Sequence, residues 1–416
     1  MKKLILAALV ALLAFGAGAQ GKEIRVLLAN HPYGDLLKTL IPDFEQQTGI
    51  KVNVEQYQES QLSTKLATEF ATGSSTVDVF MTRPLQDGKM FYKNGWYKPL
   101  TGYDFSDFPK NALQPVTFGS KIYTVPILTE WEVLYYRADL LKAAGIAVPK
   151  TLAELEAAAA KLNKDGVAGI ASRGKGNPGV TQFASYLYNY GGTFLDKGKA
   201  VFNSKAALEA FRYYGKLLGN YGPAGVTAMS WDNLMPLFQA GKIAMWTDAS
   251  TFYGQIIDPT KSQVAKEDVG IANFPAGPKA SSPYIVVSWG VAISNKTKNL
   301  DAAQQFLAWA TSSDMQKKGL AQLAIAVARN SPWQDKATLA QVPQGLIDTR
   351  NAAAKTGIPY DRPYMSAVGE ARDRIGEVIV EAINSKGNSA NLQKLADQKV
   401  SQVNDLLQDT GEYGVQ

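Results

Sequence analysis

Two acidic residues separated by one tryptophan are the arrangement best suited to chemistry in this 416-residue chain. In an extended strand, Glu130 and Glu132 point to one face and Trp131 points to the other. Their Cα atoms would then lie roughly 6.5 to 7 Å apart, which leaves room for a water and makes glycoside hydrolysis conceivable. That reaction needs carboxyl groups on opposite sides of the bond, whereas these two approach from the same side. The pair therefore favours ligand contact, and a secreted glycoside hydrolase is the alternative.

The composition excludes most other reactive sites. The chain has no cysteine and one histidine, His31, which excludes thiolate nucleophiles, disulfides, zinc clusters and iron–sulfur centres. It also has no G-x-S-x-G nucleophile elbow and no P-loop. We therefore expect no metal and no cofactor.

One glycine motif points elsewhere. Gly174, Gly176 and Gly179 form a G-x-G-x-x-G pattern with Asp196 downstream, an arrangement typical of dinucleotide binding. The residues before Asp196 lack the pattern of the second strand that such a unit requires. We interpret the glycines as a turn, with Arg173 beside them facing a cleft.

The first eighty residues alternate between strand and helix patterns. Apolar, β-branched runs predict strands over 23–28, 51–54 and 77–81, and apolar residues at helical spacing lie between them. Such alternation predicts an α/β fold with a parallel sheet and helices on both faces.

Ligands of such sheets bind beyond the carboxyl ends of the strands. The polar and aromatic residues that follow the three predicted strands are therefore candidates for ligand binding. They are Asn30, His31, Tyr33, Gln58 and Arg83.

The N-terminus has the three-part layout of a secretory signal peptide. Lys2 and Lys3 precede an apolar run over 4–15 and an A-x-A site that ends at Ala19. No cysteine follows to accept a lipid, so we expect a periplasmic or secreted protein. Loss of 1–19 removes two lysines and lowers the formal net charge from +6 to +4, which gives no indication of nucleic-acid binding. A mature chain of this length predicts about two domains.

Several segments along the chain resemble those of one known family. In order they are "DLLKTLIPDFEQQTGIKVNV", "DVFMT", "YTVPILTEWEVLYYRADLLKAAGI", "GKIAMWTDAS", "VGIANFPAGP" with "SWGVAISNKTKN", and "DAAQQFLAWATSSDMQKK". Together they resemble the family 1 extracellular solute-binding proteins, which include the maltose-binding and sugar-alcohol-binding proteins of ABC importers.

The resemblance implies a type II periplasmic-binding-protein fold, with two lobes around a ligand cleft. It implies an N-terminal lobe of 20–130 and 276–325 and a C-terminal lobe of 131–275 and 326–416. The chain would cross between them near 129–131, 274–277 and 324–327. The implied function is that a monomer closes around a sugar or sugar alcohol and delivers it to a membrane permease.

The resemblance also adds candidate site residues. Sugar binding uses aromatic faces against C–H groups and fixed polar groups for hydroxyls. We expect Trp131, Trp246 and Trp289 to line one cleft. The full set of further candidates is Glu130, Trp131, Trp246, Asp248, Ser288, Trp289, Gly290 and Arg329.

Overall fold

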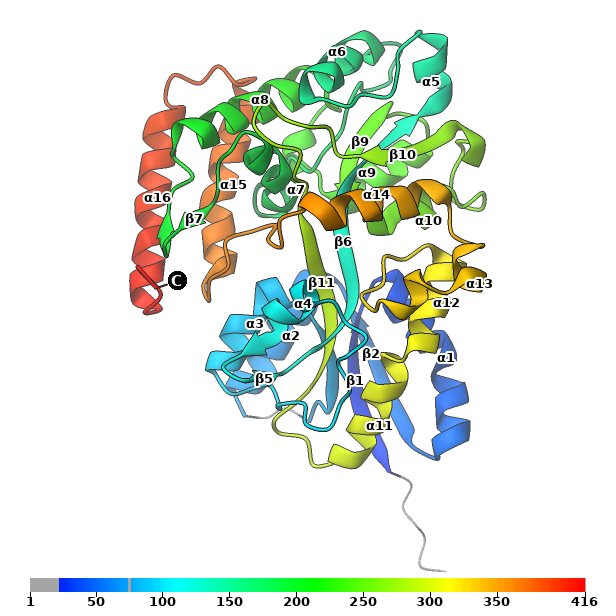
Figure 1. The fold of residues 1–416 in the computed structure, drawn as a ribbon. Helices are drawn as coiled ribbons and strands as arrows, with labels where there is room; N and C mark the ends of the chain where they lie inside the picture. Colours follow the sequence, from blue (N-terminus) through cyan, green and yellow to red (C-terminus); the bar gives the residue numbers. More distant parts are fainter. Residues whose placement is uncertain (1–21, 74–75, 416) are drawn as a thin grey trace, which may run out of the picture.

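The computed structural model describes residues 22–73 and 76–415. The predicted signal peptide, 1–19, lies outside the described residues. Figure 1 shows two lobes, with the N-terminal strands in the lower one and helices α5 to α9, α15 and α16 in the upper one. No helix among the described residues is both long enough and apolar enough to cross a membrane.

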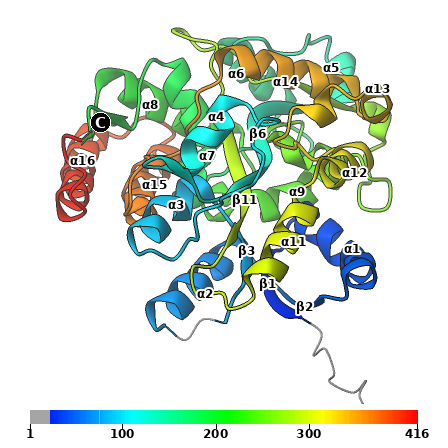
Figure 2. The ribbon, with the colours of Figure 1, turned by 60° about the horizontal axis from the view of Figure 1, so that its bottom comes forward.

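The N-terminal lobe confirms the predicted strand–helix alternation. Strands β1 and β2 run parallel, as do β1 and β3, and Gly49 ends α1 with a positive φ of 70°. Helices α1 and α11 cover one face of this sheet and α2 covers the other (Figure 2). The elements are β1 (Glu23–Ala29), α1 (Pro32–Thr48), β2 (Lys51–Tyr57), α2 (Glu59–Ala71), β3 (Val79–Thr82), α3 (Pro84–Lys93), α4 (Lys110–Leu113), β4 (Thr117–Phe118), β5 (Lys121–Ile122), α11 (Leu300–Ala310), α12 (Ser313–Leu323) and α13 (Lys336–Leu339).

One long strand, β6 (Val125–Arg137), belongs to both lobes. Up to Trp131 it pairs with β11 (Ile285–Ile293), which pairs in turn with β3. From Glu132 onward it pairs with β9 (Met245–Ala249) and β10 (Val269–Asn273) of the other lobe. Seven strands of the two lobes therefore form one sheet. Six of them follow the order β10-β6-β11-β3-β1-β2, and β9 also pairs with β6.

The C-terminal lobe packs helices around a second core. A capping box of Thr151 and Glu154 begins α6, and Phe183 of α7 stacks on Phe211 of α8 with ring centroids 4.2 Å apart. The elements are α5 (Ala138–Ala143), α6 (Leu152–Leu162), α7 (Gly176–Asn189), β7 (Leu195–Asp196), β8 (Lys199–Ala200), α8 (Lys205–Tyr221), α9 (Trp231–Gln239), α10 (Tyr253–Ile256), α14 (Gln344–Thr356), α15 (Val368–Asn384) and α16 (Leu392–Asp409).

Helices α7 and α15 approach each other through glycines. A Cβ added to Gly376 of α15 would lie 2.4 Å from the carbonyl carbon of Gly176, so the two helices could not come as close with a larger residue at position 376. At two positions of the G-x-G-x-x-G pattern a larger residue would also clash with backbone atoms. A Cβ on Gly174 would meet the backbone of Val226, and a Cβ on Gly179 would meet the backbone of Arg173. The motif therefore serves close packing at the start of α7.

Two of the segments expected as crossings contact one lobe. Segment 274–277 lies against the C-terminal lobe, where Ala276 bridges to Thr151 and the Gly277 N–H donates to Asn189. Strand β11 after it pairs with β6 and β3. Segment 324–327 runs beside β6, and α13 after it packs on α12. Helix α14 then packs on β10.

Candidate functional site

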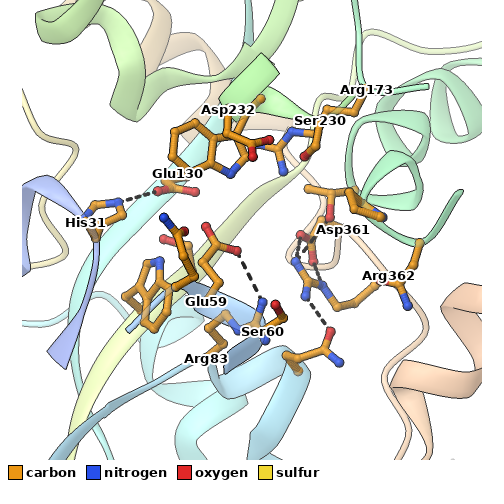
Figure 3. Close-up of a pocket in the computed structure, with 18 of the residues that line it drawn as sticks. His31, Glu59, Ser60, Arg83, Glu130, Arg173, Ser230, Asp232, Asp361 and Arg362 are labelled. Carbon is orange, nitrogen blue, oxygen red and sulfur yellow. Dashed lines mark hydrogen bonds and ion pairs between the residues drawn. The ribbon is translucent and has the colours of Figure 1, made fainter. Parts of the chain in front are cut away.

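A cavity of about 560 Å³ lies between the two lobes (Figure 3). The loops after β1, β2 and β3 form its N-terminal wall, as the strand-end rule predicts. The starts of α7 and α9, the segment after β9 and residues 361–373 form its C-terminal wall. The lining residues are Asn30, His31, Pro32, Gln58, Glu59, Ser60, Ser63, Thr64, Arg83, Gln86, Glu130, Arg173, Lys175, Asn177, Pro178, Thr181, Ser230, Trp231, Asp232, Thr251, Phe252, Tyr284, Ser288, Trp289, Asp361, Arg362, Arg372 and Asp373.

Seven of the thirteen predicted site residues line this cavity. The structure thus brings together loops that are distant in sequence. The seven are Asn30, His31, Gln58, Arg83, Glu130, Ser288 and Trp289.

The N-terminal ends of α1 and α3 position the cavity-lining residues of the N-terminal lobe. His31 is the N-cap of α1, where its Nδ1 accepts from the Tyr33 N–H at 3.2 Å, and its Nε2 then lies 3.8 Å from Glu130. Arg83 precedes α3 and binds two residues of α2, Glu59 at 3.3 Å and Ser63 at 2.8 Å. Burial raises the pKa of the Glu59 carboxyl, but Arg83 and other nearby cations outweigh this and lower it.

A buried ion pair positions Arg173 at the opposite wall. Its Nη2 lies 2.5 Å from Asp248 Oδ1, and its Nε lies 3.0 Å from Asp248 Oδ2. The same carboxylate accepts from the Gln182 amide and the Ala249 N–H, both within 2.9 Å. Four donors from three parts of the lobe therefore hold this carboxylate, and Arg173 is fixed in the cavity wall.

Five buried polar atoms of cavity-lining residues have no hydrogen-bond partner within the described part of the chain. They come from both lobes and include donors and acceptors. They are His31 Nε2, Arg83 Nε, Thr251 Oγ1, Ser288 Oγ and Arg372 Nε. Because buried polar groups are almost always paired, their gathering around one cavity favours a ligand rich in hydrogen-bonding groups.

Aromatic rings supply flat surfaces in the same cavity. The guanidinium of Arg83 lies 5.8 Å from the ring centre of Trp289. On the other wall, Trp231 stacks on Phe252 with centroids 5.1 Å apart. Trp289 and Trp231 come from different lobes, so each of the two walls of the cavity contains an indole ring.

The prediction that three tryptophans line the cleft is wrong for two of them. Trp246 is fully buried and stacks behind Phe252, 5.8 Å away, so it supports the wall without forming it. Trp131 is buried in the core, where its indole N–H donates to Thr349. Both faces of β6 and β9 are covered in the C-terminal lobe, so strand alternation alone could not tell core from cleft.

Four further candidates also lie outside the cavity. Tyr33, turned inward by α1, donates its hydroxyl to the Ala310 carbonyl, and Asp248 lies behind Arg173. Gly290 pairs within the sheet, where a Cβ would lie 2.3 Å from Thr124. Arg329 stays in the N-terminal lobe, bound to Asp107 at 3.2 Å.

An irregularity in β11 explains why Ser288 and Trp289 do reach the cavity. The register with β6 shifts on both sides of Trp289. Such bulges redirect side chains. The sequence indicates this break only through the Trp289–Gly290 pair.

Sequence reasoning missed most of the C-terminal wall and part of the N-terminal wall. In the N-terminal wall, Glu59 lies one residue beyond the predicted Gln58, so the strand-end rule could have found it. Trp231 begins α9 behind the capping box of Ser230, a helix signal without a strand before it. Arg362 and Arg372 lie in a helical tail with no strand signal.

Glu132 is buried inside the C-terminal lobe and does not line the main cavity. Its side chain is 1% exposed, and neither carboxylate oxygen has a hydrogen-bond partner among the described residues. Burial, together with the nearby Asp248, raises its pKa well above the ordinary value. The two acids of the Glu130–Glu132 pair therefore do not share a cavity.

Comparison with known proteins identifies the family. The model of the bacterial extracellular solute-binding proteins matches residues 29–317, more than half of the chain. The chain belongs to this family. Within the described residues, no group of histidine and acidic side chains is arranged to hold a metal ion.

Relatives of this solute-binding protein include polyol-binding proteins. It is 29% identical to a mannitol-binding protein of Pseudomonas aeruginosa over 266 residues, an alignment that spans 61% of each chain. It is 26% identical to an erythritol/L-threitol-binding protein of Mycolicibacterium smegmatis, over 73% of this chain and 69% of that one. A solute-binding protein from Agrobacterium radiobacter K84 in complex with ribitol superposes with a TM-score of 0.82 at 26% identity, over 93% and 99% of the two chains. The predicted two-lobed fold is thereby confirmed.

Substitution of the tryptophans should separate core from cavity. Trp246→Ala should lower the free energy of unfolding by about 3 to 5 kcal/mol, the usual cost of removing a large buried aromatic. Trp289→Ala should weaken ligand affinity about ten- to hundredfold, because it removes apolar area worth roughly 1 to 3 kcal/mol from the cavity wall. Thermal unfolding and calorimetry on both variants measure this. Unchanged affinity in a folded Trp289→Ala protein would contradict the assignment.

Glu132→Gln should stabilise the protein more as the pH rises. With its raised pKa, the folded state keeps a proton that the unfolded chain loses above about pH 4.3, so wild-type stability falls as the pH rises. The glutamine of the variant does not titrate, so the stability of the variant lacks this decrease with pH. Melting temperatures from pH 5 to 8 should show a growing advantage over wild type, whereas the exposed control Glu370→Gln should follow the wild-type curve. A constant difference across this range would refute the assignment.

Proposed function

We propose that this chain binds a sugar or sugar alcohol between its lobes and presents it unaltered to the membrane permease of an ABC importer. The observation that carries the proposal is the set of buried polar atoms in the cavity wall that have no hydrogen-bond partner among the described residues. A hydroxyl both donates and accepts, so a polyhydroxy ligand suits a wall that mixes donors with acceptors.

The remaining wall supports the same ligand class. The acids Glu130 and Asp232 can accept from hydroxyls, and charge-assisted bonds of this kind are the stronger ones. Trp289 and Trp231 can cover C–H groups. Relatives that are named for mannitol and erythritol, and the ribitol complex, favour a polyol within this class.

The proposed cell location is outside the cytoplasm, following the signal peptide expected over 1–19 and the family's description as extracellular. We propose a monomer that does not bind nucleic acid. For the lobes we keep the first limit near Glu130, move the second into β11 and move the third to 340–343, because pairing and packing change partners there.

Glycoside hydrolysis has less support. Glu132 does not line the cavity that Glu130 lines, so the two carboxyl groups cannot flank one bound sugar there. The known relatives are binding proteins.

Calorimetry against sugars, sugar alcohols, amino acids and peptides tests the proposal. We expect binding of at least one sugar or polyol without turnover. Glu130→Gln should weaken that binding about tenfold, since a charged hydrogen bond is replaced by a neutral one. Glu132→Gln is the matched control and should bind as wild type does. Response to amino acids or peptides alone, or release of product from a glycoside, would contradict the proposal.

Ligand binding should also close the lobes. The crossings in β6, in β11 and after α13 are the segments at which the backbone can bend. Small-angle scattering should therefore give a smaller radius of gyration with the bound sugar than without it. An unchanged radius at saturating ligand would contradict a hinge motion.

A further inference from the structure

Arg372 is a buried guanidinium without a counter-ion. It lines the cavity, is 5% exposed and has no carboxylate within ion-pair distance among the described residues. Its three hydrogen bonds go to neutral acceptors: Gln86 Oε1 at 2.7 Å, the Asn177 carbonyl at 2.9 Å and Thr181 Oγ1 at 3.2 Å. Its Nε has no partner among those residues. An isolated buried charge of this kind is costly unless an anion accompanies it.

A second arginine shares the acceptors of Arg372. Arg362 donates to the same Gln86 oxygen at 2.9 Å and to the same Thr181 hydroxyl at 3.3 Å. Among the described residues, Asp361 is the one carboxylate that pairs with Arg362, at 2.5 Å. Two guanidinium groups thus share neutral acceptors, and a carboxylate pairs with only one of them in the described part of the chain.

The wider surroundings add positive charge. Burial lowers the pKa of Arg372 most, the like charges of Arg362, Arg83 and Arg173 lower it further, and the charge of Asp361 opposes them. Figure 3 shows Arg83, Arg173 and Arg362 pointing into the cavity from different sides.

Three other groups at this end of the cavity do not neutralise the positive charge of Arg372. Asp373 is exposed and accepts from the Asn177 amide instead of from Arg372. The first turn of α7 also lines this end, and a helix N-terminus favours negative charge. Lys175, just before α7, is a further cation.

We infer that the ligand carries one anionic group, a carboxylate or a phosphate, and that Arg372 and Arg362 bind it between α7 and α15. This inference rests on the proposed function and narrows its ligand to an acidic or phosphorylated sugar or polyol. Gln86 belongs to the N-terminal lobe and the two arginines to the other, so the anion would bind where the lobes meet.

Inorganic phosphate tests the anion site without knowledge of the sugar. The melting temperature of wild type should rise along a saturable curve with sodium phosphate, relative to sodium chloride of equal ionic strength. Arg372→Gln should lose this rise. Arg374→Gln, on the same helix but paired with Glu377 at the surface, should keep it.

Two results of that experiment would overturn the inference. One is a wild type without a phosphate-specific rise, and the other is an equal rise in Arg372→Gln. Without phosphate, Arg372→Gln should melt at or above the wild-type temperature, because the variant no longer buries an unpaired charge. A lower melting temperature would indicate a purely structural arginine and would also overturn the inference.

Matched ligands then identify the anion. Calorimetry should compare ribitol, D-mannitol and D-glucitol with their aldonic acids and with their terminal phosphates. The preferred acid or phosphate should bind at least about tenfold tighter than its neutral partner, and Arg372→Gln should abolish that preference. Neutral polyols that bind as tightly as their acids would overturn the inference and leave the proposed function intact. If no sugar, polyol or derived acid binds, both fail.

Discussion

The architecture depends on one strand that is shared by two lobes. Strand β6 pairs with β11 as far as Trp131 and with β9 and β10 from Glu132 onward. Every backbone group of a buried strand needs a partner, so the change of partners can occur only where both neighbouring strands reach β6. That point lies beside the cavity. As a result, Glu130 lines the cavity, whereas Glu132, two residues later, is enclosed in the core.

Buried charge shapes the cavity as much as apolar packing does. Arg173 and Arg83 are held by carboxylates that lie behind or beside them, so their side chains are positioned in the absence of ligand. Preorganised donors of this kind lose little conformational entropy on binding. Removal of one partner from such a pair leaves the other as an unpaired buried charge, which makes the network sensitive to single substitutions.

The contact between α7 and α15 adds a residue from the C-terminal part of the chain to this network of charged side chains. Gly376 allows the backbone of α15 to lie against the backbone of α7 at Gly176. This close approach lets Arg372 of α15 reach the Asn177 carbonyl and the Thr181 hydroxyl of α7. A glycine outside the motif that resembles a nucleotide-binding pattern thus helps to place an arginine in the cavity wall.

Sequence patterns alone predict the α/β class, the strand–helix alternation of the first lobe and the loop residues after β1, β2 and β3. Local periodicity specifies such elements, and the parallel sheet brings the ends of its strands to one edge. Packing between distant parts of the chain, in contrast, determines which tryptophans line the cavity and brings Arg362 and Arg372 to its wall. Trp246 lies on a strand with both faces covered, so its neighbours decide its burial. Arg362 and Arg372 reach the cavity only because helices distant in sequence pack together, and no local sequence pattern predicts that contact.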